Sequence, residues 1–169
     1  SLARMSMLPQ AGNRRSKNVL KSILAARNYQ ETISYAFVEE KWESDFAANA
    51  NPIRLMNPIA SQMSVMRSTL IGGLVAGLQH NLNRKQDRVR LFEVARVFNG
   101  VAADQQPERI AALAWGGRFA EQWGTSKERV DFFDVKADVE ALLAPRVAEY
   151  RRANHPALHP GRSAEVVLD

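Results

Sequence analysis

The stretch from Arg88 to Phe98 constrains the fold of this chain more than any other segment. It carries apolar side chains on both faces of an extended run, a pattern typical of a strand in the middle of a sheet. A second strand is predicted at 108–115, after a loop at 101–107, and it ends at Gly116 and Gly117. The chain therefore needs a sheet with other elements packed against it.

Helical periodicity supplies the elements that can cover such a sheet. Apolar side chains recur every three to four positions in 14–27 and in 69–85, and acidic residues suited to a helix N-terminus open 134–143. We also expect a short amphipathic helix at 39–48 and a single helical turn at 120–124.

Shorter strands are predicted on either side of these helices. Residues 32–38 alternate between apolar and small or polar side chains, and 52–58 is a short run bounded by prolines. Strands at 149–153 and 163–168 flank a tight turn at 155–161. Because no regular strand–helix–strand alternation is present, we predict an α+β fold with an antiparallel or mixed sheet flanked by helices.

Length and composition bound the class of protein. A chain of 169 residues fits one domain, which we place at 14–169 after a linker or arm at 1–13. We expect the domain to be truncated at its C-terminal end, since the sequence stops inside a strand-like run. The absence of cysteine excludes disulfides, thiolate catalysis and cysteine-based zinc sites. No apolar run is long enough to span a bilayer, and a cytoplasmic location is expected.

The net charge of +5 and the pI near 9.9 raise the question of whether the chain binds nucleic acid. Residues 1–30 hold six of the 23 basic side chains and no acidic one, so the remaining chain is electrically balanced, with 17 basic and 18 acidic residues. Arg14, Arg15 and Lys17 are the candidates for RNA contact. A freestanding RNA-binding module that uses this basic arm is the alternative function.

Two patterns resemble ligand sites, but the sequence explains both without a ligand. Gly72, Gly73 and Gly77 lie inside a periodic helix, so they indicate close helix packing, within the chain or between subunits, rather than a phosphate loop. His155 and His159 are each followed by proline, which excludes a helical metal site.

Three acidic residues, Asp131, Asp134 and Asp138, are suited to helix capping as well as to magnesium. We predict no catalytic, cofactor-binding or metal-ligating residue in this chain. Glu93 is the remaining charged residue of interest, because it lies on an apolar face of the central strand. A lone carboxylate there would be costly to desolvate, so we expect an ion pair with Arg67 or with Arg96. A catalytic carboxylate is the alternative reading of Glu93.

Six short motifs occur along the chain in a distinctive order and spacing. They are Asn57–Ile59, Ser64–Leu70, Asn81–Arg84, Val89–Glu93, Val130–Lys136 and Asn154–Arg162. Taken together, they resemble the bacterial phenylalanyl-tRNA synthetase β subunit. The resemblance covers nearly the whole chain from about Arg14 onward.

The resemblance implies a fold like the class II aminoacyl-tRNA synthetase core. Helix 14–27 and strand 31–38 resemble the first class II motif, the unit through which cores pair. The central strand resembles the second motif, which in active cores ends in Phe-Arg-x-Glu. This chain reads Phe98-Asn99-Gly100-Val101, so it lacks both the guanidinium for the ATP phosphate and the carboxylate. The resemblance therefore implies a core without adenylate chemistry.

The expected role is a non-catalytic scaffold in the β subunit of an α₂β₂ enzyme that charges tRNA with phenylalanine. ATP and magnesium would serve the α subunit, and an active ligase core is a further rival reading. The isolated chain is expected to bind the α subunit or to self-associate through an apolar patch. The candidate interface residues are Leu20, Ile23, Leu24, Ile33, Tyr35, Phe37, Gly73 and Gly77.

Overall fold

Two long antiparallel strands, β5 (Arg88–Arg96) and β6 (Glu108–Gly116), form the centre of a four-stranded sheet. A computed structural model describes residues 3–7, 15–119 and 128–168 of the chain. β1 (Ala3–Met7) pairs antiparallel with β6, and β2 (Gln30–Glu31) pairs parallel with β5. The strand order is β1-β6-β5-β2, so the mixed sheet expected from the sequence is confirmed.

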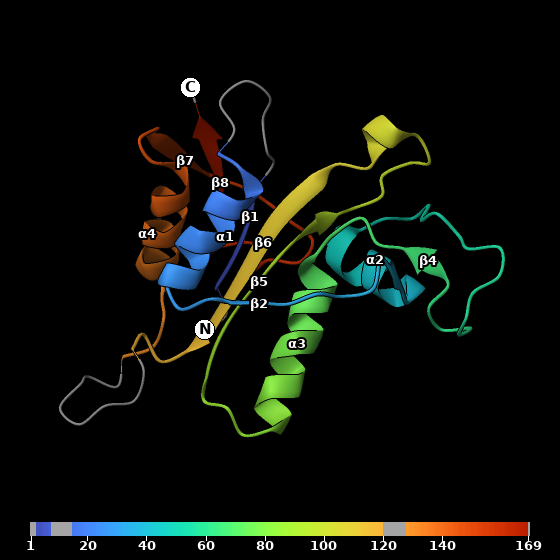
Figure 1. Cartoon of the computed structure of the whole chain (residues 1–169), viewed down its shortest axis with the longest axis horizontal. Helices are drawn as coiled ribbons and strands as arrows, with labels where there is room; N and C mark the ends of the chain where they lie inside the picture. The colour runs from blue at the N-terminus through green and yellow to red at the C-terminus, as the bar shows by residue number, and fades with distance from the viewer. Residues whose placement is uncertain (1–2, 8–14, 120–127, 169) are drawn as a thin grey trace.

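Two helices cover one face of this sheet, α1 (Lys17–Ala26) and α4 (Phe132–Leu143) (Figure 1). The Ser16 side chain caps α1 by accepting a hydrogen bond from the Val19 amide at 3.3 Å. The buried core on this side contains Leu24, Tyr29, Phe92, Ile110, Ala112, Ala114, Val130, Val135, Val139 and Leu142.

A third helix, α3 (Ile71–Asn83), lies on the opposite face of the sheet (Figure 1). Successive side chains of a strand point to opposite faces, so Phe92 faces α1 and α4 while Leu91 and Glu93 face α3. The buried core on the α3 side contains Leu70, Leu74, Leu78, Val89, Leu91, Val97, Ala111 and Leu113. These two cores confirm the prediction that the central strand packs on both faces.

The remaining elements are small and lie around the sheet. The helix predicted at 39–48 is confirmed as α2 (Glu40–Ala47), and a short 3₁₀ helix, η1 (Ala103–Gln105), occupies the loop between β5 and β6. Two-residue strands β3 (Phe37–Val38) and β4 (Val65–Met66) pair antiparallel. The predicted C-terminal hairpin is confirmed as β7 (Ala148–Arg152) and β8 (Ala164–Leu168).

The structure corrects two predicted strands. Residues 32–36 lie between β2 and β3 in no regular element. The Thr32 amide still donates to Phe92 of β5, but the Ser34 amide and the Ser34 and Tyr35 carbonyls bond to the side chains of Glu93 and Arg67. The strand predicted at 52–58 is reduced to one isolated bridge, between Arg54 and Val65. Ala3–Met7, within the predicted arm, is a paired edge strand, and the helical turn predicted at 120–124 lies outside the described residues.

In the part of the chain that the structure describes, no helix is both long enough and apolar enough to cross a membrane.

Candidate functional site

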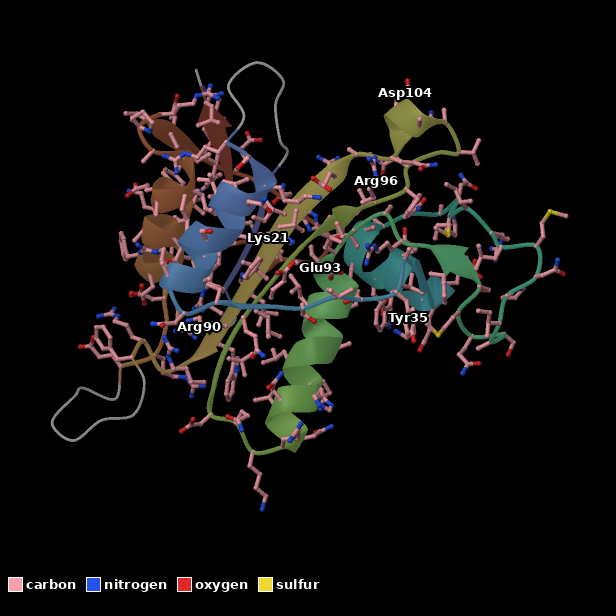
Figure 2. All side chains as sticks on the ribbon, in the orientation of Figure 1. Lys21, Tyr35, Arg90, Glu93, Arg96 and Asp104 are labelled. Atoms are coloured by element: carbon pink, nitrogen blue, oxygen red, sulfur yellow. The ribbon has the colours of Figure 1, made fainter. Side chains whose placement is uncertain are left out.

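Glu93 is a deeply buried carboxylate on the α3 face of the sheet, with 2% of its surface exposed. Its Oε1 accepts a hydrogen bond from the Ser34 amide at 2.9 Å, and its Oε2 accepts one from the Ser34 hydroxyl at 3.0 Å. Arg67 Nη1 lies 3.3 Å from Glu93 Oε1 and supplies the countercharge. Figure 2 shows Glu93 where β5 passes the N-terminal end of α3. A carboxylate with a cation and two further donors is stable in such a place.

Arg67, rather than Arg96, is therefore the partner of Glu93. The Arg67 guanidinium also donates to the backbone carbonyls of Ser34 at 3.3 Å, Tyr35 at 3.2 Å and Arg96 at 3.0 Å. The Arg96 guanidinium instead donates to the carbonyl of Gln106 at 2.9 Å, near η1 (Figure 2). One buried cation thus joins the sheet to residues 32–36, which we call the anchored loop.

The anchored loop presents large apolar side chains to solvent. Ile33 is 89% exposed and Tyr35 is 71% exposed, although the backbone on either side of Ser34 is fixed by buried charges. The Tyr35 ring stacks on the Phe37 ring, with centroids 5.3 Å apart. Apolar side chains held outward on a fixed backbone suit a surface that another protein covers. We call Ile33, Tyr35 and Phe37 the docking surface.

A second buried carboxylate, Glu43 of α2, holds the residue that follows Arg67. The amide of Ser68 donates to Glu43 Oε1 at 2.9 Å, its hydroxyl donates to Oε2, and Asn49 Nδ2 donates to Oε2 at 2.9 Å. The dipeptide Arg67-Ser68 is therefore fixed between two buried carboxylates. Sequence reasoning missed Glu43, although its position three residues before the apolar Phe46 of the same helix was a usable signal.

Several predicted interface residues contact this chain itself. Leu24 is fully buried, and Leu20 and Ile23 pack against the same core, so the apolar face of α1 is covered by the sheet and α4. A Cβ atom added to Gly73 would lie 2.6 Å from the Ser34 hydroxyl, and one on Gly77 would lie 3.0 Å from Leu91. The glycine face of α3 thus packs inside the chain at these two positions, as the close-packing interpretation expects.

The candidate RNA-contacting residues that the structure describes bind to other parts of the domain. Lys17 forms an ion pair with Glu108 at 2.9 Å. The Arg15 guanidinium donates to the carbonyls of Ala141 and Ala144 in and after α4. Arg14 lies outside the described residues. These contacts hold the start of α1 against the sheet and α4.

The acidic residues considered for magnesium have structural partners. Asp131 and Asp134 form a reciprocal capping box at the start of α4, and the backbone hydrogen bond from Asp134 lowers the pKa of Asp131. Asp138 accepts hydrogen bonds from Arg27 and from the Tyr29 hydroxyl at 2.6 Å, and burial raises the pKa of Tyr29.

The two candidate histidines stabilise the turn between β7 and β8. Nδ1 of His155 accepts from the Ala157 amide, and Nδ1 of His159 accepts from the Gly161 amide, both at 3.1 Å. Among the residues that the structure describes, no group of three His, Cys, Asp or Glu side chains is arranged to hold a metal ion.

A polar pocket of about 310 Å³ opens where β5 ends and β6 begins. Asn99, which the class II resemblance places where an active core would have arginine, lines this pocket together with Thr69 and His155. Arg109 of β6 also lines it, and burial lowers the pKa of its guanidinium. Val101, at the position of the missing carboxylate, is exposed. Sequence reasoning identified Asn99 but missed Arg109, because the two approach each other only when the strands pair.

Comparison with known proteins is consistent across the chain. Residues 2–169 match the family model described as the phenylalanyl tRNA synthetase beta chain CLM domain. Among similar proteins, the phenylalanine–tRNA ligase β subunit of Chromobacterium violaceum is 67% identical over 98% of this chain and 21% of its own length. That of Cupriavidus pinatubonensis is 56% identical over 99% of this chain and 22% of its own length. The chain thus spans about a fifth of the curated relatives it matches.

A solved structure shares the fold at low sequence identity. Desulfitobacterium hafniense PylSc, a pyrrolysyl tRNA synthetase, superposes with a TM-score of 0.52 and 11% identity, over 82% of this chain and 48% of its own. This likeness confirms the predicted class II synthetase-like fold. From the family match and the identities, the chain belongs to the phenylalanyl-tRNA synthetase β-chain family, in which it corresponds to the CLM domain.

Proposed function

We propose that this chain is a non-catalytic subunit-interface domain of a phenylalanine–tRNA ligase, and that its docking surface binds the α subunit. The observation that carries the proposal is the exposure of Ile33 and Tyr35 on a loop whose backbone is fixed by the buried Arg67–Glu93 pair. Fixing the loop before binding reduces the entropy that association costs. The isolated chain exposes the same surface, and we propose that it self-associates there.

Chemistry is assigned to the α subunit in this proposal. The whole enzyme charges tRNA with phenylalanine in the cytoplasm, using ATP and magnesium. In this chain Asn99 is neutral, so it cannot stabilise the charge that develops on a phosphate during adenylate formation. Val101 offers no carboxylate beside it. An active ligase core would instead catalyse phenylalanine- and ATP-dependent pyrophosphate exchange with this chain alone, and that result would contradict the proposal.

The proposal is tested by placing charged or polar side chains on the docking surface. Ile33→Asp and Tyr35→Ser are introduced into the full-length β subunit, and the dissociation constant for the α subunit is measured by sedimentation velocity. Each variant is expected to weaken assembly roughly tenfold or more, because a buried apolar anchor is replaced by a hydrated group. Both side chains are exposed in this domain, so its fold is expected to be retained.

The matched control is Val147→Asp, which adds the same charge at a side chain that is 81% exposed on another part of the domain, before β7. It is expected to leave assembly unchanged. Equal assembly by Ile33→Asp, Val147→Asp and the unmodified subunit would show that the anchored loop does not bind α.

A further inference from the structure

We infer that the polar pocket between the ends of β5 and β6 is an oxyanion-binding site, which takes a phosphate or carboxylate group through Arg109, Asn99 and Thr69. This inference goes beyond the proposed docking function and does not depend on it. The anchored loop does not line the pocket.

The first support is the environment of Arg109. Its position on β6 directs the side chain to the α3 face, where it lines the pocket with Asn99. Its guanidinium forms no ion pair or hydrogen bond within the described part of the chain. Burial alone lowers the pKa of its guanidinium. A partly buried cation without a countercharge is the arrangement that an anion stabilises.

The second support is the supply of neutral donors around that cation. The Asn99 carboxamide makes no hydrogen bond to any described residue, although its backbone amide donates to Gln105. The Thr69 hydroxyl accepts from the Ile71 amide at 3.2 Å, which leaves its own proton for another acceptor. Together these groups provide several N–H and O–H donors in the lining of one pocket, a set that suits a multi-oxygen anion.

The third support is that the nearby carboxylates are bonded to other groups and do not neutralise Arg109. Glu108, which neighbours Arg109 in sequence, is paired with Lys17, and Glu43 is bonded to Ser68 and Asn49. No carboxylate lines the pocket among the described residues. Its volume of about 310 Å³ lies at the low end of the roughly 300–1,000 Å³ typical of small-molecule sites.

Anion binding here would not restore adenylate chemistry. Arg109 belongs to the second strand of the pair, whereas the class II resemblance implies that an active core has its guanidinium at the position of Asn99. The inferred site holds a ligand group and provides no side chain for a reaction.

The experiment titrates the chain with inorganic phosphate and follows its backbone amide and arginine Nε–H resonances by NMR. Sodium acetate and sodium chloride are titrated separately at matched ionic strength. Saturable shifts in residues 97–99 and 109 with phosphate or acetate, but not with chloride, are expected. Response to phosphate alone assigns a phosphate group to the site, and response to acetate as well extends it to carboxylates.

Variants distinguish this site from general charge attraction. Arg109→Gln is expected to weaken phosphate binding roughly tenfold, whereas Arg152→Gln, which removes the same charge from an exposed residue of β7, leaves it unchanged. Asn99→Arg, at an exposed position, is expected to tighten binding, a gain that loss of folding cannot produce. The inference is overturned if chloride gives the same shifts, or if Asn99→Arg and Arg109→Gln both bind phosphate like the unmodified chain.

Discussion

Arg67 is the side chain that fixes how the anchored loop lies on the sheet. One guanidinium reaches a buried carboxylate and the carbonyls of Ser34, Tyr35 and Arg96. A planar group with five donors can bond several acceptors in different directions, whereas lysine would present one compact charge. The Arg67–Glu93 pair therefore fixes the position of the anchored loop in addition to stabilising the fold.

Removing this cation tests its role. Arg67→Met keeps much of the side-chain volume but leaves Glu93 charged and buried, so the free energy of unfolding is expected to fall by about 3 kcal/mol or more. Urea denaturation at neutral pH measures this loss of unfolding free energy. Arg96→Met is the matched control, because that guanidinium is exposed and donates one bond to Gln106. Equal losses for the two variants would show that the buried pair does not stabilise the fold.

At the scale of residues, the sequence identified a buried site where a charged residue interrupts an apolar pattern. Glu93 could be identified because it interrupts the apolar face of a strand, and burial requires a partner for it. Ser34 could not be identified as a further partner, since it is a small polar residue on the polar side of the alternating segment 32–38. Arg109 was not identified, because only the pairing of β5 with β6 brings it to the same pocket as Asn99.

At the scale of elements, helices were predicted more accurately than short strands. The periodic segments became α1, α2, α3 and α4 with small changes at their ends. The alternation in 32–38 predicted a strand, but at Ser34 and Tyr35 the backbone bonds to the side chains of Arg67 and Glu93 instead of to a neighbouring strand. Alternation of apolar and polar residues predicts which side chains share a face. It does not predict the hydrogen-bond partners of the backbone.

The close approach of α3 to the anchored loop gives a second test. Gly73→Ala would place a methyl group 2.6 Å from the Ser34 hydroxyl, which is held by Glu93, so we expect a loss of about 1–3 kcal/mol in unfolding free energy. Gly77→Ala meets only a terminal methyl of Leu91, at 3.0 Å, and alanine favours the helix, so its loss is expected to be smaller.

Thermal unfolding of the two variants provides the comparison. If Gly73→Ala is as stable as Gly77→Ala, or more stable than the unmodified chain, then the loop does not restrict α3 at that point.

At the scale of the whole molecule, the sequence predicted the layers but not the strand order. Apolar side chains on both faces of 88–98 required cover on two sides, which α1 and α4 provide on one face and α3 on the other (Figure 1). The pairing of β1 with β6 joins residues about a hundred positions apart, and no local pattern specifies it. For the same reason the face of α1 was predicted as an interface, although the fold buries it.

The most direct test of the account is to find where the α subunit covers this domain. Hydrogen–deuterium exchange of the chain is measured by mass spectrometry, alone and mixed with purified phenylalanine–tRNA ligase α subunit. Peptides that contain residues 32–37 are expected to exchange more slowly when α is present, with little change in the hairpin of β7 and β8. Unchanged exchange at 32–37, with protection elsewhere in the domain, would contradict it.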